Sequence, residues 1–310
     1  MSAGYPMKLT IAIPTHNRAR LLAQTLDSVQ RLQLGDGLEA DCLVIDNASR
    51  DDTAAVVESY ADAPLIKVRR IFESQQGSSF ARNRAVDEAR GDLILFIDDD
   101  VTVEPNWARE LVGEIERRNL DAACGLVLAR WTGPPPQWLG PVLYVKLAVH
   151  DPALADHADG MDEVVHNYFS ANVGFRRATF ERFGRFREDL GVSGSNPMSG
   201  EDTELFARII ERGGRMGFAR RAVVHHWIGP ERLTRGYFRH KSFAFGVGTA
   251  FKGGRSHNHL DKFLRNALRM TAAAARGDSS RAFYHQLECV NFFGYWRGRL
   301  MRRGASPSVE

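Results

Sequence analysis

Three consecutive acids follow a short apolar run in this 310-residue sequence. Asp98, Asp99 and Asp100 come directly after Leu-Ile-Leu-Phe-Ile at residues 93–97. Five apolar residues without alternation predict a strand that is buried on both faces, near the middle of a sheet. Because ligands of open α/β sheets bind beyond the carboxyl ends of the strands, we expect these acids to serve chemistry. The alternative is a solvated acidic turn.

Acids in this arrangement suit a reaction that releases a phosphate group. Carboxylates spaced as in Asp98-x-Asp100 can hold a divalent cation that bridges two phosphate oxygens and neutralises a departing diphosphate. Without a cation, neighbouring carboxylates repel and raise each other's pKa. We therefore expect a divalent metal, Mn or Mg, as cofactor.

A fourth acid and a pair of histidines occur later in the chain. Asp202 should lie in the first turn of a helix, where the helix dipole keeps a carboxylate ionised and able to accept a proton as general base. Acids are also common in first turns without a catalytic role. His225 and His226 end an expected strand and should point to opposite faces, so at most one would face a metal, and we favour His226.

The elements that must position these residues alternate along the chain. Strands are expected at residues 9–13, 42–45, 66–71, 93–97 and 216–225, with Pro14 ending the first. Helices are expected at 21–29, 49–60, 77–91, 107–118, 176–183, from 201 and after 233. The helix at 49–60 would open with a capping box at 49–52. In the helix from 201, Leu205, Ile209 and Ile210 should point inward. This alternation predicts an α/β fold with a central, mostly parallel sheet flanked by helices, a proline-rich loop at 131–138 and a helical C-terminal extension.

Composition narrows the class of protein. The formal net charge of +3 provides no overall basic field, so nucleic acid is not an expected partner. The three cysteines form no CxxC pair, which favours a reducing cytoplasm. No stretch approaches the ~18 apolar residues that span a bilayer. We expect a cytoplasmic protein, with the inner face of the membrane as a second location.

Four motifs in the first third of the chain resemble family 2 glycosyltransferases of the GT-A fold, in the family's order and spacing. They are IAIPTHNR at 11–18, VIDNASRDDT at 44–53, GSSFARN at 77–83 and GDLILFIDDD at 91–100. GEDTE at 200–204 resembles the acceptor-side acidic motif of the family. VHH at 224–226 resembles its C-terminal metal-binding histidine.

The resemblance implies a Rossmann-like GT-A fold, inversion at the sugar and a role for each matching residue. Asp202 would be the general base, Asp100 with His226 or His225 would bind the metal, and the nucleotide would contact Pro14, Thr15, Asn17, Arg18, Asp46, Arg82, Asp98 and Asp99. Two alternatives stay open. Asp46 with Ser49 could cap a helix, and Arg82 could be a surface helix residue.

Function and organisation are predicted together. Residues 1–125 would bind the nucleotide sugar, 126–232 would bind the acceptor and carry the base, and 233–310 would form a basic, aromatic extension. The acceptor would be a hydroxyl of a glycan, a polysaccharide or a lipid-linked precursor. A nucleotidyltransferase-like metal enzyme and a non-catalytic sugar-binding scaffold are the alternatives. The extension could contact a membrane surface, pack in the core or form a homodimer face.

Overall fold

The computed structural model describes residues 6–153, 168–191, 200–251 and 259–304. The chain divides into two compact units. Unit 1 comprises Met1–Arg130, His150–Glu188 and Glu201–Trp227, and unit 2 comprises Trp131–Val149, Asp189–Gly200 and Ile228–Glu310. The predicted boundaries at residues 125 and 232 concern function and stay a prediction.

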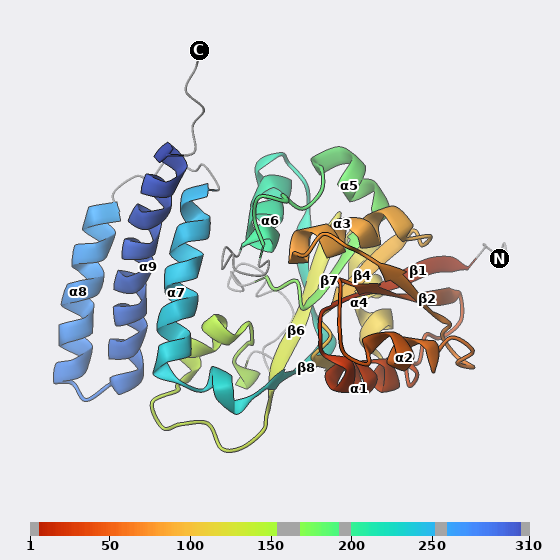
Figure 1. Ribbon diagram of the computed structural model, residues 1–310, viewed down its shortest axis with the longest axis horizontal. Coiled ribbons are helices and arrows are strands. Elements are labelled where there is room, and N and C mark those ends of the chain that lie inside the picture. Colours follow the sequence, from red (N-terminus) through yellow and green to blue (C-terminus); the bar gives the residue numbers. More distant parts are fainter. Residues whose placement is uncertain (1–5, 154–167, 192–199, 252–258, 305–310) are drawn as a thin grey trace, which may run out of the picture. The chain divides into compact units, whose positions relative to one another are not determined.

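Unit 1 is built on an eight-stranded sheet in the order β3-β2-β1-β4-β7-β6-β8-β5 (Figure 1). The strands are β1 Met7–Thr15, β2 Leu38–Asp46, β3 Val68–Phe72, β4 Leu93–Ile97, β5 Val101–Val103, β6 Ala122–Trp131, β7 Asn172–Arg176 and β8 Met216–Ile228. β1 pairs in parallel with β2 and β4, and β2 with β3. The β4–β7, β6–β7 and β5–β8 ladders are antiparallel, so the sheet is mixed.

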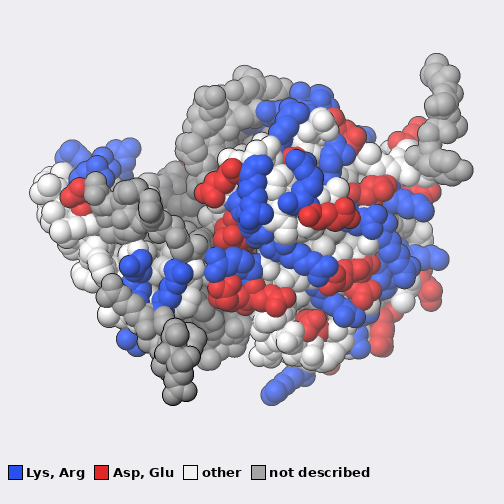
Figure 2. Space-filling model, turned by 90° about the horizontal axis from the view of Figure 1, so that it is seen from above, with Lys and Arg blue, Asp and Glu red and all other residues white. Residues whose placement is uncertain are grey.

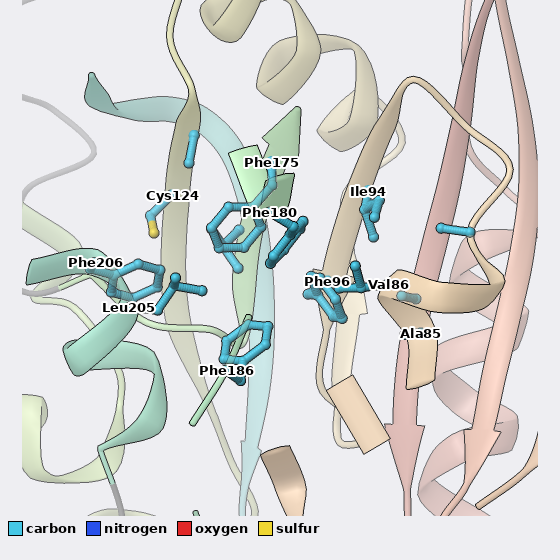
Figure 3. Packing of buried hydrophobic residues seen from close by; sticks show 14 of the residues in the cluster. Ala85, Val86, Ile94, Phe96, Cys124, Phe175, Phe180, Phe186, Leu205 and Phe206 are labelled. Carbon is cyan, nitrogen blue, oxygen red and sulfur yellow. The ribbon is translucent and has the colours of Figure 1, made fainter. Parts of the chain in front are cut away.

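Six helices of unit 1 accompany this sheet. They are α1 Ala19–Val29, α2 Thr53–Glu58, α3 Ser78–Glu88, α4 Trp107–Arg117, α5 Arg177–Phe183 and α6 Glu201–Glu211. Phe96 of β4 and Phe175 of β7 meet edge to face, with ring centroids 6.0 Å apart, and Phe206 of α6 stacks on Phe175 (Figure 3). This aromatic core fixes α6, and with it the start of that helix, against the middle of the sheet.

β4 has the predicted bounds and central place, but three local predictions are wrong. β1 continues through Pro14, because the ladder with β4 has ended at Ala12 and only β2 flanks the strand there. The capping box at 49–52 does not form: α2 begins at Thr53, whose N–H and hydroxyl both donate to the Asp51 carboxylate. Ile210 is half exposed because α6 turns it away from the core.

Unit 2 contains the predicted helical extension. It consists of the 3-10 helices η1 Pro141–Leu147 and η3 Pro230–Arg232 and the α-helices α7 Arg235–Phe251, α8 His259–Ala275 and α9 Ser279–Gly304. α9 packs against both α7 and α8. A Cβ atom added at Gly294 would lie 2.1 Å from the Phe243 carbonyl oxygen, so only glycine lets α7 and α9 approach this closely. No helix in the described part of the chain combines the length and apolar character needed to cross a membrane.

Candidate active site

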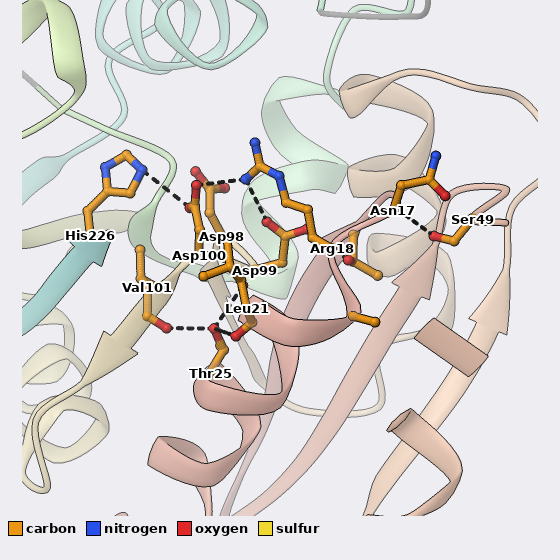
Figure 4. A network of polar contacts seen from close by, with 12 residues as sticks. Asn17, Arg18, Leu21, Thr25, Ser49, Asp98, Asp99, Asp100, Val101 and His226 are labelled. Carbon is orange, nitrogen blue, oxygen red and sulfur yellow. Dashed lines mark hydrogen bonds and ion pairs between the residues drawn. The ribbon is translucent and has the colours of Figure 1, made fainter. Parts of the chain in front are cut away.

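The acid triplet lies at the carboxyl end of β4, where Asp99 and Asp100 are buried (Figure 4). The Thr15 hydroxyl donates to Asp99 Oδ2 over 2.8 Å. Arg18 Nη1 donates to Asp99 Oδ1 over 3.0 Å and to Asp100 Oδ2 over 2.6 Å. Burial raises the pKa of Asp99 to about 6, and the positive charge of Arg18 opposes this rise. The Arg18 guanidinium thus compensates part of the charge of Asp99 and Asp100.

The two histidines of β8 point in different directions. β8 pairs with β5 so that His226 lies opposite Val101 and His225 opposite Thr102. His226 is buried, and its Nε2 lies 3.3 Å from Asp100 Oδ1. Nε2 of His225 instead lies 2.7 Å from Glu104 Oε1. The alternation of the strand therefore brings His226 to the triplet and His225 to Glu104.

The side chains of Asp100 and His226 are of a kind that can bind a divalent cation that also binds phosphate. Mg²⁺ in phosphate-transfer sites is commonly held by one or two carboxylates together with substrate phosphates and water. Asp100 and His226 provide one carboxylate and one imidazole. Within the described residues, no group of three or more His, Cys, Asp or Glu side chains is arranged to hold a metal. Asp100 and His226 could therefore supply part of the ligands of such a cation.

Asn17 joins the loop after β1 to the loop after β2, and Asp46 holds the loop after β2 to β3. Asn17, at a φ of 53°, accepts the Arg50 N–H on its Oδ1 and donates its own N–H to the Ser49 hydroxyl. Asp46 is buried, accepts the Ser49 N–H over 2.9 Å and pairs with Arg70 over 2.7 Å. Asp46 therefore stabilises this turn, but α2 begins only at Thr53, so the alternative that Asp46 with Ser49 caps a helix is wrong. Its contact with a nucleotide stays a prediction, as does that of Pro14.

Arg82 is buried inside unit 1, so its alternative as a surface helix residue is wrong. Only 6% of it is exposed, although it lies on α3. Its Nη1 donates to Glu201 Oε1 over 2.6 Å, and its Nη2 donates to Asp98 Oδ1 over 3.3 Å. Ser78 also donates to Glu201. The guanidinium thus connects the acid triplet to the first residue of α6.

Asp202 is the second residue of α6. Its Oδ2 accepts a hydrogen bond from the Ser170 hydroxyl over 3.0 Å, and its Oδ1 accepts the Thr203 N–H over 2.7 Å. Because Glu201 precedes it, the contacts of Arg82 fix the helix start that carries Asp202. The geometry therefore links the Asp98 end of the triplet to the expected base.

Sequence reasoning missed three residues that shape this site. Glu201 had a visible signal, since it is an acid in a first turn beside Asp202. Asn47 follows β2, is buried, and accepts the Gly77 N–H while donating to the Gln75 carbonyl, which holds the loop before α3. Ser170 carried no signal of its own.

Comparison with known proteins decides the family. The model of glycosyl transferase family 2 matches residues 10–184, more than half of the chain. This chain belongs to glycosyl transferase family 2. It is a glycosyltransferase that takes its sugar from a nucleotide sugar, as the motifs implied. Nucleotidyl transfer and the non-catalytic scaffold are set aside accordingly.

Two relatives extend the similarity beyond the matched segment. The glucosyl-dolichyl phosphate glucuronosyltransferase of Haloferax volcanii is 24% identical over 242 residues, which cover 76% of this chain and 74% of that protein. The succinoglycan biosynthesis protein ExoM of Rhizobium meliloti is 26% identical over 275 residues, covering 87% of this chain and 82% of ExoM.

Solved structures confirm the GT-A fold. The mannosyltransferase PcManGT from Pyrobaculum calidifontis, in complex with GDP-Man and Mn²⁺, superimposes with a TM-score of 0.60 at 17% identity, covering 98% of this chain and 77% of PcManGT. S. aureus TarS 1-349 in complex with UDP gives a TM-score of 0.52 at 17% identity, covering 98% of this chain and 94% of the TarS chain.

Proposed function

We propose that this glycosyltransferase inverts the configuration of the transferred sugar in a single displacement with Asp202 as general base. The acceptor oxygen forms a bond to the anomeric carbon while the bond from that carbon to the diphosphate breaks. The acceptor proton moves to the Asp202 carboxylate, and the electron pair leaves with the diphosphate. The link from Asp98 through Arg82 and Glu201 to the start of α6 carries this proposal, because it holds the base relative to the donor end of the sheet.

The donor side of the proposal rests on the two loops and the triplet. Thr15, Asn17, Arg18 and Asp46 would contact the nucleotide, and Arg82 with Asp98 and Asp99 would orient the ribose and sugar. Arg18 is suited to a phosphate, since its guanidinium already donates to two carboxylate oxygens and arginine binds phosphate oxygens by the same kind of charge-assisted hydrogen bond. Pro14 would keep the loop after β1 close to the base of the nucleotide.

Asp100 and His226 would hold the divalent metal, Mn or Mg. When bound, the cation supplies charge neutralisation for the departing diphosphate. Support comes from the chemistry of these side chains, a buried carboxylate beside a buried imidazole. His225 is the less favoured ligand because its ring already contacts Glu104.

For the acceptor we propose a hydroxyl of a glycan or of a lipid-linked precursor. The relatives named above act on a glucosyl-dolichyl phosphate and in succinoglycan biosynthesis, according to their names. Cys42, Cys124 and Cys289 are free thiols, which suits a reducing compartment such as the cytoplasm.

Asp202→Asn tests the base. The substitution keeps the size of the side chain and one acceptor oxygen, but the amide cannot take up the acceptor proton, so we expect kcat to fall by about 10²–10⁴-fold while donor affinity, measured by calorimetry, is unchanged. Glu204→Gln, two residues further on the same helix and paired with Arg208, is the matched control and should keep near-normal turnover. Normal turnover of Asp202→Asn would refute the assignment. The anomeric configuration of the product, determined by NMR, tests inversion separately.

Donor and metal are identified by thermal shift. Nucleotide sugars are screened with Mn²⁺, with Mg²⁺ and with EDTA, because a ligand that binds only the folded state raises the melting temperature. We expect one nucleotide sugar to stabilise the protein only when a metal is present, and Asp100→Asn to lose that dependence. Stabilisation that EDTA does not change would contradict the metal site.

A further inference from the structure

The large exposed apolar side chains gather on the last two helices. Twelve such side chains are exposed in the described residues, and seven of them lie on α8 or α9. On α8, Leu260, Leu264 and Leu268 follow one another at four-residue spacing and form one stripe, with Leu264 51% and Leu268 70% exposed. Exposed patches of this kind mark interaction surfaces more often than single exposed residues do.

A second stripe on α9 continues the first. Phe293, Trp296 and Leu300 are exposed and are spaced to share one face of α9. Phe263 of α8 contacts the Phe293 ring, with centroids 5.6 Å apart, so the two stripes meet across the α8–α9 seam. We name the six exposed residues of these stripes the apolar face: Leu260, Leu264, Leu268, Phe293, Trp296 and Leu300.

Positive charge surrounds the apolar face. Residues 259–304 contain nine Lys and Arg against three Asp and Glu, a formal charge of +6 in a chain whose net charge is +3. Arg265 and Arg269 each follow a leucine of the stripe by one position, so they flank it by about a quarter turn, in a row that begins with Asp261. In the left part of Figure 2, formed by the C-terminal helices, Lys and Arg stand among uncharged groups with little Asp or Glu.

We propose that the apolar face binds the surface of a bilayer that contains anionic phospholipids. Leucine, phenylalanine and tryptophan side chains would enter the boundary between headgroups and acyl chains, while the flanking arginines would contact lipid phosphates. Surface binding fits these helices, since none that is described is apolar enough to cross the bilayer. A second copy of this face is a poor occupant, because the arginines that flank the face would be brought close to those of the other copy and repel them.

Vesicle co-sedimentation of the full chain tests this surface without any use of the transferase reaction. The probes are vesicles of phosphatidylcholine alone and vesicles with added phosphatidylglycerol. We expect binding only to the anionic vesicles, weakened about fivefold for each arginine charge removed in Arg265→Gln and Arg269→Gln. Leu264→Ser combined with Leu268→Ser should weaken binding at least tenfold. Two variants of unit 1 are the controls. Leu65→Ser changes a leucine as exposed as Leu264, and Arg212→Gln removes an exposed arginine charge; both should bind the anionic vesicles like the unchanged protein.

A second measurement separates insertion from charge attraction alone. Lipids brominated on their acyl chains should quench part of the tryptophan fluorescence of the bound protein, and Trp296→Phe should remove most of that quenching. Three results would overturn the proposal: no binding to anionic vesicles, binding that the leucine substitutions leave unchanged, or a dimer in sedimentation velocity that Leu264→Ser dissociates. Each can occur while transferase activity is intact, so this test and that of Asp202 fail independently.

Discussion

The carboxyl ends of the strands in unit 1 and the last two helices of unit 2 differ in which side chains are buried and which are exposed. In unit 1, charged side chains are buried and each is held by a specific partner, as with Arg82 between Asp98 and Glu201. On α8 and α9, apolar side chains face outward and lie beside exposed cations such as Arg265 and Arg269. Burying charges is costly without partners, whereas exposing leucines is costly without a cover.

The difference indicates where each region obtains its function. Charge pairs that are buried before any ligand arrives hold a site in a fixed geometry, which suits chemistry that depends on short distances. An exposed apolar face tolerates variation in the exact position of its residues, because lipid surfaces adapt to shape. Substitutions should therefore affect the two regions through different observables.

Arg82→Ala should have the largest effect on stability. Removing this guanidinium leaves Glu201 buried without its cation, and loss of one partner of a buried pair typically costs about 3–5 kcal/mol. Urea unfolding followed by circular dichroism measures the change. Arg84→Ala is the control, because Arg84 lies on the same helix and makes an exposed pair with Glu88, worth less than about 1 kcal/mol. Similar losses for both variants would show that the Arg82 network is not a structural requirement.

Two leucines sharpen the contrast between inside and outside. Leu205 of α6 is fully buried in the core of unit 1, so Leu205→Ala should lower the free energy of unfolding by about 2–5 kcal/mol. Leu268→Ala should lower it by less than about 0.5 kcal/mol, since that side chain is mostly exposed. If Leu268→Ala proves as destabilising as Leu205→Ala, the leucine stripe packs against other parts of the protein, and the proposal that the apolar face binds a bilayer is refuted.

Neighbouring histidines provide a test within one strand. His226→Ala should weaken metal-dependent donor binding by about 10–100-fold, because this ring lies beside Asp100. His225→Ala should leave that binding unchanged, since its ring faces Glu104. Calorimetric titration of the nucleotide sugar with Mn²⁺ measures both. If His225→Ala weakened this binding and His226→Ala did not, the metal would have to be assigned to the face of β8 that carries His225.

Cysteine reactivity should differ between the regions as well. Burial raises the pKa of the Cys42 and Cys124 thiols, both inside unit 1, and so suppresses their reactive thiolates. Cys289 on α9 is only partly buried. A chromogenic disulfide reagent should modify Cys289 alone in the native protein and all three cysteines in urea. Rapid reaction at a second native thiol would indicate that the sheet opens locally.

In the parallel half of the sheet, β1, β2 and β4 could be predicted because each contains a mostly apolar run, and β3 was expected at residues 66–71 although it carries two arginines. Of the strands in antiparallel ladders, β8 was predicted at residues 216–225, but β5, β6 and β7 were not. β7 has the sequence Asn-Val-Gly-Phe-Arg, which carries no strand pattern, yet Asn172 is completely buried. Its side chain accepts from Trp107 Nε1 and donates to the carbonyls of Leu126 and Ala222. Three distant segments satisfy this amide, so no local window of sequence indicates its burial.

The same reasoning applies to the candidate site. Residue types came from motifs, and strand alternation implied that at most one of His225 and His226 faces a metal, of which His226 was favoured. The partners did not follow from the sequence: Arg82 meets Glu201 across 119 positions, and Ser170 meets Asp202 across 32. Contacts at such separations depend on the whole fold. For this reason Arg82 could not be distinguished from a surface residue until the fold was known.

The place of β4 in the sheet has a consequence for how the chain acquires its structure. All five residues of β4 are buried, and its two neighbours lie far away in sequence: Leu93 pairs with Leu9 on one side and with Arg176 on the other. During synthesis the parallel half can assemble first, but β4 then presents an apolar edge until β7 emerges from the ribosome. Such an edge is a template for pairing with other chains. We expect truncated chains that end before residue 172 to aggregate, and the full chain to refold slowly because its central contacts are non-local.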